Sequence, residues 1–291
     1  MSKERSLYDR VAMEASAVVI RRYSTSFGLA SKLLSPPVRQ HVENIYALVR
    51  LADEVVDGVA AEACLEADAI RSQLDTLEAE TNEAMRCGFS TNLVVHAFAM
   101  TARETGFGEE LTAPFYASMR ADLSQTAHTP ESFERYVYGS AEVVGLMCLK
   151  AFLVGHRYSA ADDERLVDGA RHLGAAFQKI NFLRDLAADF TALGRSYFPG
   201  VDVDSFTEAQ KSAIIDDIQN DLDIACSTLT LLPSSSRRAV VLAQGLFAEL
   251  TGRLRETPAS VLVTTRIRVP NPVKMRIAAL AAAGRLPKEH V

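Results

Sequence analysis

Apolar residues recur along most of the chain at intervals of three, four and seven residues, which is the spacing of one face of a helix. The segments with this spacing are long and rich in good helix formers. Strict alternation of apolar and polar residues, the pattern of a strand, is nearly absent. The pattern therefore predicts an all-α protein, with helical segments at 16–23, 41–56, 69–86, 92–104, 142–155 and 166–190.

Clusters of Pro, Gly and Ser separate these segments, and such clusters interrupt helices. No low-complexity spacer, block of like charge or repeat of fixed period divides the sequence into two halves. We therefore expect one domain over residues 1–291, in which short connections join the helices of a bundle. The connections are expected at 34–40, 86–92, 104–110, 127–133, 193–202, 231–238 and 269–274.

The segment IYALVRLADEVVDG, residues 45–58, carries charges within an otherwise apolar helical pattern. A solvated polar face is one interpretation, because roughly four or five acidic pairs at i,i+4 arise by chance in a chain with 37 acidic residues. The apolar surround favours another, since a buried carboxylate must be paired or bound to a cation. Two carboxylates one helical turn apart suit Mg²⁺. The polar stripe spans roughly 60° and consists of Tyr46, Arg50, Asp53 and Asp57.

A second narrow polar stripe is predicted in AAFQKINFLRDLAADF, residues 175–190. A solvated face is again the alternative. Two such helices facing each other would surround metal ions with oxygen donors from both sides, and that arrangement suits a diphosphate. The stripe spans roughly 80° and consists of Gln178, Asn181, Asp185 and Asp189, with Arg184 on its flank.

These two motifs resemble those of the squalene/phytoene synthase family, the head-to-head prenyl transferases. DEVVD (53–57) resembles the first aspartate-rich motif of that family, and NFLRDLAAD (181–189) resembles the second, with the NxxRDxxxD spacing intact. The likeness spans nearly the whole chain and implies an isoprenoid synthase helical bundle around a central active-site cavity. Further signatures in family order are STSFGLASKLL (24–34), YALVR (46–50), MRAD (119–122), YVYGSAEVVGLM (136–147), Gln178 and GRSYFP (194–199).

The resemblance also implies a role for individual residues. The implied ligands of Mg²⁺, or of Mn²⁺ in its place, are Asp53, Asp57, Asn181, Asp185 and Asp189. The implied substrate-binding residues are Arg50, Arg184, Gln178, Ser26 and Phe27, with Arg266 or Arg268 added from TTRIRVPNPVK (264–274). Tyr46 is expected to act beside the aspartates, either by stabilising positive charge or by orienting phosphate. For Phe27, plain core packing is an equal alternative.

Two positions depart from the family pattern. Glu54 stands where many members have a third aspartate, and the helical wheel places it at the edge of the stripe, so Asp53 and Asp57 can still be ligands. Glu142 stands in SAEVVG, where the family commonly has a small residue. We expect Glu142 either to line the cavity or to face outward.

The implied reaction is the joining of two prenyl diphosphates with release of diphosphate. GFG at 106–108 lacks the third glycine and the preceding strand of a dinucleotide fingerprint, and the chain ends soon after Lys274, so no requirement for NADPH is expected. The preferred expectation is condensation of two geranylgeranyl diphosphates to phytoene through prephytoene diphosphate. The alternatives are a squalene or dehydrosqualene synthase that uses farnesyl diphosphate, and a non-catalytic assembly or lipid-binding relative.

Composition sets limits on partners and compartment. The chain is 48% apolar, and its net charge of −6 gives no basic footprint, so nucleic acid is not an expected partner. The four cysteines contain no CxxC pair, which predicts reduced core thiols in a cytoplasmic protein. MSKERSLYDR at the start lacks the apolar region of a signal peptide. Peripheral contact with the inner face of a membrane, for product release, and the oligomeric state both stay open.

Overall fold

The computed structural model describes residues 3–57, 59–193 and 196–284, without the side chains of residues 3–5, 61 and 188–193. The described residues fold into helices joined by short connections, and the one β-bridge among them pairs Ala127 with Ser196. The prediction of an all-α protein is therefore confirmed.

The helices vary widely in length. In chain order they are α1 (Lys3–Tyr23), α2 (Ser26–Ser31), α3 (Pro36–Val56), α4 (Val59–Glu62), α5 (Ala67–Cys87), α6 (Leu93–Thr105), α7 (Glu109–Asp122), α8 (Pro130–Val137), the π-helix η1 (Tyr138–Glu142), α9 (Val143–Leu153), α10 (Ala160–Leu193), the 3₁₀ turn η2 (Val203–Ser205), α11 (Glu208–Thr228), the 3₁₀ turn η3 (Leu229–Leu231), α12 (Ser234–Glu256), α13 (Ala259–Leu262) and α14 (Asn271–Ala282).

Local chemistry explains several of the predicted breaks. Gly88 and Gly106 follow α5 and α6 in the left-handed conformation, with φ of 81° and 76°, which glycine adopts without strain. Asn92 caps α6 by accepting hydrogen bonds from the backbone N–H groups of Val94 and Val95. The sequence pattern at 86–92 and 104–110 therefore predicts these helix ends correctly.

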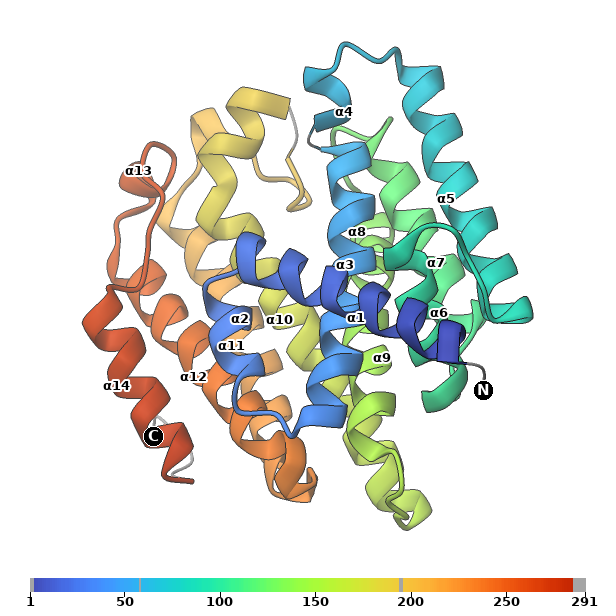
Figure 1. The fold of residues 1–291 in the computed structure, drawn as a ribbon. Helices are drawn as coiled ribbons and strands as arrows, with labels where there is room; N and C mark the ends of the chain where they lie inside the picture. The colour runs from blue at the N-terminus through green and yellow to red at the C-terminus, as the bar shows by residue number, and fades with distance from the viewer. Residues whose placement is uncertain (1–2, 58, 194–195, 285–291) are drawn as a thin grey trace.

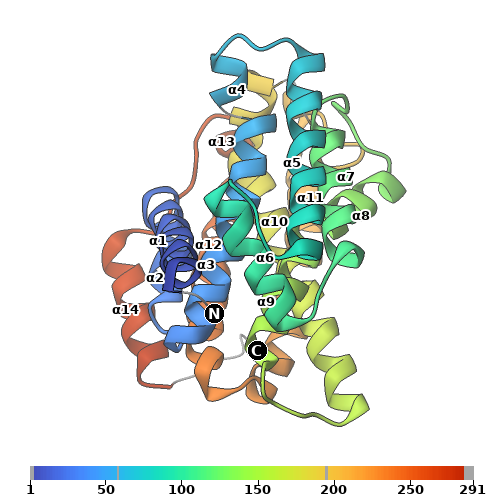
Figure 2. The ribbon, with the colours of Figure 1, turned by 45° about the vertical axis from the view of Figure 1, so that its right-hand side comes forward.

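Helix α3 runs through the middle of the molecule, and α1 lies across it (Figures 1 and 2). In Figure 1, α5, α6 and α7 lie on one side of α3, and α10, α11, α12 and α14 lie on the other. The short helices α4 and α13 lie at the end of the bundle where α3 ends (Figure 1). The carboxyl-terminal end of α3 is therefore flanked by connecting elements from distant parts of the sequence.

The apolar arcs of the two helices that carry the polar stripes are buried. Leu48 and Ala52 of α3 join a cluster built with α5, α6, α7 and α9. Ile180 and Leu183 of α10 join a second cluster that includes Ile215 of α11. Burial of these arcs removes apolar area from water and fixes each helix against its neighbours. It leaves the polar stripe of each helix on the remaining arc.

One helix, Pro130–Leu153, has the length and apolar composition needed to cross a membrane, among the residues described. It consists of α8, η1 and α9 and packs between α7 and α10. Glycines permit the close approach: a Cβ at Gly139 would lie 2.2 Å from the carbonyl oxygen of Pro114, and one at Gly145 would lie 2.5 Å from that of Ala170. The helix is therefore a packed element of the bundle.

The four cysteines are free thiols, which agrees with the prediction of reduced cysteines. The prediction that all four belong to the core is wrong for two of them. Cys64 and Cys87 are exposed, because they lie in and beside the connections that flank α5. Cys148 and Cys226 are partly buried within helices.

Candidate functional site

The first polar stripe lies at the carboxyl-terminal end of α3. Tyr46, Arg50 and Asp53 occupy successive turns and are partly exposed, whereas Leu48 and Ala52 between them are buried. Asp57 differs from the sequence prediction, because α3 ends at Val56 and Asp57 is the C-cap. Its backbone N–H still donates to the carbonyl of Asp53, at 2.8 Å. The sequence places glycine directly afterwards, and glycine favours a helix end.

Asp53 is a carboxylate in an unfavourable environment for charge. Burial raises its pKa to about 7, Arg50 opposes this rise, and the like charges of Asp57 and Glu54 add to it. An ionised carboxylate of this kind gains stability from any cation placed beside it. The first stripe therefore fits a divalent metal ion.

Arg50 is held by two neighbours on the same side of the site. Its guanidinium forms an ion pair with Glu54 and lies over the ring of Tyr23, 4.4 Å from the ring centroid. Its Nε is buried and donates no hydrogen bond within the described structure. A buried unpaired donor is costly and fits an anionic partner. Glu54, the first departure from the family pattern, is thus the ion-pair partner of Arg50.

The second stripe is dominated by one carboxylate and two arginines. Arg184 donates to Asp185 from Nε, at 3.0 Å, and from Nη2, at 2.5 Å. Arg266 reaches the same carboxylate, with Nε 2.9 Å from Oδ1 and Nη2 3.2 Å from Oδ2. Two guanidinium forks on one carboxylate give a strongly cationic group beside the acid. Arg266 comes from the connection between α13 and α14, 81 residues away in sequence.

Other predicted residues have a less defined place. Asn181 and Gln178 are partly buried on α10, but no contact with the first stripe is recorded for them. Arg268 is exposed, and no contact with Asp185 is recorded for it, unlike Arg266. The side chain of Asp189 lies outside the described residues. Among the described side chains, no group of three or more His, Cys, Asp or Glu forms a metal cage. The carboxylates are thus presented separately by α3 and by α10.

Aromatic side chains connect the two stripes. The ring of Phe27 on α2 lies 6.5 Å from that of Tyr46 and 5.7 Å from that of Phe177, centroid to centroid. Phe177 in turn stacks on Phe247 of α12 at 3.9 Å. Phe27 therefore both packs in an aromatic cluster and lies between the helices that carry the two stripes. Both alternatives for Phe27 in the sequence are compatible with this position.

The serine beside Tyr46 is Ser24, two residues before Ser26, which the sequence predicts to bind substrate. Ser24 hydrogen-bonds the Tyr46 hydroxyl, which partly offsets the rise that burial causes in the pKa of Tyr46. Ser24 also accepts a hydrogen bond from the backbone N–H of Phe27, at 3.0 Å. Ser26 lies on the first turn of α2, where no contact with either stripe is recorded. The role of Ser26 in binding substrate stays a prediction.

Sequence reasoning also missed a buried cluster around Asp122. The hydroxyl of Tyr136 lies 2.8 Å from both oxygens of Asp122, and the hydroxyl of Tyr197 lies 3.5 Å from one of them. Burial raises the pKa of Tyr136 well above its usual value, and the charges of Asp122 and Asp57 add to the rise, so this hydroxyl stays protonated. The signal was the acidic residue in MRAD followed by YVYGS, motifs that identified the family but not the contact.

Glu142, the second departure from the family pattern, is ion-paired. Its Oε2 accepts a hydrogen bond from Arg171 Nε at 2.7 Å, and Arg171 is an exposed residue of α10. The pair joins η1 to α10 beside Tyr138, over whose ring Arg171 also lies. The Glu142 side chain is only 14% exposed, so it is a largely covered acid whose charge is met by an arginine at the surface.

Comparison with known proteins shows the family to which the chain is similar. The family model "Squalene/phytoene synthase" matches residues 20–273. The phytoene synthase of Pseudescherichia vulneris is 34% identical over 181 residues, which cover 60% of this chain and 56% of that protein. The 15-cis-phytoene synthase of a Paracoccus species is 31% identical over 64% of this chain and 59% of its own length. Matches to these two relatives thus span less than two thirds of each, whereas the phytoene synthase of Mycobacterium bovis is 27% identical over 91% of this chain and 88% of its own length.

Solved structures show the same fold. A dehydrosqualene synthase superposes with a TM-score of 0.80 at 21% identity and covers 95% of this chain and 97% of its own. The squalene synthase HpnC from Alicyclobacillus acidocaldarius superposes with a TM-score of 0.73 at 21% identity, over 86% of this chain and 95% of its own. At this level of identity the superpositions establish the architecture, which is the predicted isoprenoid synthase bundle.

Proposed function

Because the chain belongs to the squalene/phytoene synthase family of prenyl transferases, we propose that it joins two prenyl diphosphates head to head, and specifically two geranylgeranyl diphosphates to phytoene through prephytoene diphosphate. The family uses divalent metal ions with prenyl diphosphates. The observation that carries the proposal is the pairing of acids with arginines on both helices: Asp53 beside Arg50, and Asp185 beside Arg184 and Arg266. The shared apolar clusters of the bundle support one domain over residues 1–291.

The residues present fit Mg²⁺, or Mn²⁺ in its place. The proposed ligands on α3 are Asp53 and Asp57, and those on α10 are Asn181, Asp185 and Asp189. A bound metal ion supplies Lewis acidity toward the diphosphate leaving group. The fit to the metal ion rests on the charge-destabilised carboxylate of Asp53, and the unpaired buried donor of Arg50 fits the anionic diphosphate that would accompany it.

The arginines are proposed to hold the diphosphate itself. Arg50, Arg184 and Arg266 present planar forks that match phosphate oxygens, and each already lies beside an acid of the two motifs. Release of diphosphate leaves an allylic cation that must be shielded from water. The rings of Tyr46, Phe27 and Phe177 are placed to shield it and to stabilise positive charge.

The choice of the C20 substrate rests on the phytoene synthases among the relatives. An unpaired carboxylate beside the cavity would disfavour binding of a long apolar substrate tail. Glu142 is ion-paired with Arg171, so this argument against the C20 substrate does not apply. A farnesyl-using squalene or dehydrosqualene synthase is the second candidate, since proteins of this kind share the fold. We propose that no NADPH is needed and that the protein acts in the cytoplasm, releasing product at the inner face of the membrane.

Product analysis tests the proposal. Purified protein would receive geranylgeranyl diphosphate with Mg²⁺, with Mg²⁺ plus EDTA, and with Mg²⁺ plus NADPH, and the hydrocarbons would be resolved by chain length and conjugation. We expect a C40 conjugated triene in the first and third reactions and none in the second. A protein that binds the diphosphate but forms no hydrocarbon from C15 or C20 substrates would instead be the non-catalytic relative.

A further inference from the structure

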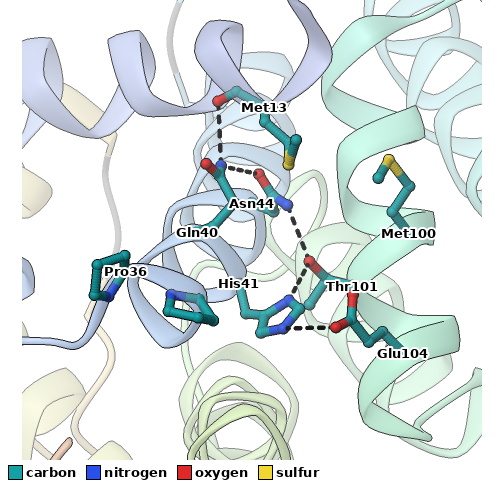
Figure 3. A pocket seen from close by; sticks show the side chains of 9 residues that line it. Met13, Pro36, Gln40, His41, Asn44, Met100, Thr101 and Glu104 are labelled. Atoms are coloured by element: carbon teal, nitrogen blue, oxygen red, sulfur yellow. Dashed lines mark hydrogen bonds and ion pairs between the residues drawn. The ribbon is translucent and has the colours of Figure 1, made fainter. Parts of the chain in front are cut away.

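Helix α3 carries a second group of polar side chains, on the face opposite the candidate site. Gln40, His41 and Asn44 lie between about 120° and 220° from Tyr46 on the helical wheel, whereas Arg50 and Asp53 lie within about 40° of it. The second group faces α1 and α6 (Figure 3). No role in the proposed reaction accounts for these three residues.

One threonine hydroxyl on α6 joins this group together. Thr101 Oγ1 accepts a hydrogen bond from Asn44 Nδ2 at 3.0 Å and lies 3.2 Å from His41 Nδ1. Gln40 Nε2 donates to Asn44 Oδ1 at 3.0 Å and to the backbone oxygen of Met13 on α1 at 3.3 Å (Figure 3). Asn44 and Thr101 are only 2% and 1% exposed. The network therefore ties α3 to two neighbouring helices through directional bonds.

The donors and acceptors in the network fit a single arrangement. Because Thr101 Oγ1 accepts the hydrogen of Asn44, its own hydrogen is available for His41 Nδ1. His41 then carries its proton on Nε2, which lies 3.7 Å from Glu104 Oε1. Burial lowers the pKa of His41, which favours this neutral form. Loss of the Thr101 hydroxyl would leave two buried partners unpaired.

The network lies beside a pocket that is partly open to solvent. This pocket of about 320 Å³ lies between Met13 of α1 and Met100 of α6. Where side chains do not fill the space between helices, packing restrains rotation of a helix about its own axis less strongly. On this side of α3, the directional hydrogen bonds of the network add to the restraint that the buried apolar arc of α3 imposes on that rotation.

Such a rotation matters to the opposite face. A roll of about 20° moves a side-chain atom about 6 Å from the helix axis by roughly 2 Å. A misplacement of about 1 Å at a reacting centre can lower a rate by about 100-fold. The alternative is an ordinary satisfied polar core, whose loss would lower stability and leave the site unchanged.

We propose that Thr101, together with His41 and Asn44, positions the active site by fixing the rotation of α3 and thereby the placement of Arg50 and Asp53. The proposal rests on the proposed function for what the site binds. It concerns residues that touch neither diphosphate nor metal, so their effect is transmitted through α3.

The test compares Thr101→Val, which keeps the shape and removes the hydroxyl, with Thr101→Ser, which keeps the hydroxyl. The matched control is Thr81→Val, because Thr81 is also fully buried and its hydroxyl bonds Tyr116 across α5 and α7, at 2.8 Å. Binding of Mn²⁺ in the presence of inorganic diphosphate is measured by electron paramagnetic resonance. The melting temperature and kcat with prenyl diphosphate are measured on the same samples.

We expect Thr101→Val to weaken Mn²⁺ binding and to lower kcat by about 10-fold or more, with Thr101→Ser within about 2-fold of wild type. Thr81→Val should lose comparable thermal stability and keep both properties. If Thr101→Val lowers only the melting temperature, or if Thr101→Ser behaves like Thr101→Val, the positioning role is wrong.

Misfolding of the variant and failure of the proposed function can each be distinguished from failure of the positioning role. If Thr101→Val does not fold, Gln40→Met replaces it as the test, because it removes the hydrogen bonds to Met13 and Asn44 at a partly buried position. The proposal then requires that Gln40→Met weaken Mn²⁺ binding in the same way. A wild type that makes no hydrocarbon overturns the proposed function, while the Mn²⁺ and diphosphate titrations still decide the positioning role. A wild type that binds no Mn²⁺ with diphosphate overturns both.

Discussion

The two aspartate motifs carry similar residues but differ in electrostatic balance. In the first, on α3, Arg50 forms its ion pair with Glu54, and Asp53 has two acids as neighbours. Burial, with the like charges of these acids, raises the pKa of Asp53 to about 7. In the second, on α10, Asp185 is gripped by both Arg184 and Arg266. Asp53 thus has one nearby arginine, whose ion pair is with Glu54, whereas Asp185 is ion-paired with two arginines.

This difference indicates that the two motifs bind metal ion and diphosphate in a different order. The charge-destabilised carboxylate on α3 gains from a metal ion alone, because the ion displaces at most a proton and no arginine. The carboxylate on α10 already has two guanidinium partners, and a metal ion must compete with them. An arriving diphosphate would give both arginines an alternative anion. We therefore expect metal to bind first at α3 and at α10 only together with diphosphate.

The largest effect is expected from removing a carboxylate of either motif. Asp53→Ala and Asp185→Ala should each lower turnover by at least about 1,000-fold, or about 4 kcal/mol, since the site loses a ligand for the ion that draws off diphosphate. Circular dichroism checks the fold. Asp216→Ala is the control, because Asp216 pairs with Arg255 on the exposed surface. Near-normal turnover by either site variant contradicts the metal assignment.

A smaller effect is expected from changing the shape of one cation. Arg184→Lys keeps the charge but cannot grip two oxygens together, so kcat/KM should fall by about 10- to 150-fold, or about 1.5–3 kcal/mol. Arg86→Lys is the matched control, because Arg86 pairs with Glu83 on the exposed surface of α5. Equal kinetics for the two variants would show that Arg184 lies outside the diphosphate site.

The sequence predicted the residues of each stripe better than the contacts between them. Tyr46, Arg50 and Asp53 share a face because helical spacing is a local property, and α3 has that spacing. Arg266 reaches Asp185 across 81 residues, and periodicity carries no information about such a contact. The same holds for Glu142, whose partner Arg171 is 29 residues away on another helix.

Local detail also escaped prediction. Asp57 ends α3 instead of lying within it, and the contact of Ser24 with Tyr46 was not predicted, because a motif does not determine each rotamer or helix end.

Removing one arginine should sharpen the contrast between the motifs. Arg266→Gln frees one side of Asp185, so binding of Mn²⁺ without diphosphate should tighten by about 3- to 10-fold while kcat/KM falls by about 10-fold. Calorimetric titration with Mn²⁺, with and without inorganic diphosphate, measures the first effect. If Mn²⁺ affinity without diphosphate is unchanged, Arg266 does not compete with metal at Asp185.

The smallest effect is expected in the pH dependence of the metal-free protein. The pKa of Asp53 is raised from 3.8 to about 7, so between these values the folded state holds this proton more tightly than the unfolded state. Its contribution to the free energy of unfolding therefore falls as pH rises from about 4 to about 7. We expect a loss of roughly 1–2 kcal/mol, since partial exposure screens the group.

Asp53→Asn should lack this part of the pH dependence, and Mg²⁺ should restore stability to wild type at pH 7 but not to the variant. Denaturant unfolding at several pH values, in chelator, provides the comparison. Parallel pH profiles for wild type and Asp53→Asn would contradict the charge-destabilised state of Asp53.

The central claim is that this chain condenses two C20 prenyl diphosphates without a reductant. The most direct measurement is a competition assay with equal farnesyl and geranylgeranyl diphosphate, Mg²⁺ and no NADPH, with hydrocarbons resolved by chain length. The account predicts that the C40 conjugated triene predominates. Predominance of a C30 hydrocarbon would contradict the phytoene assignment.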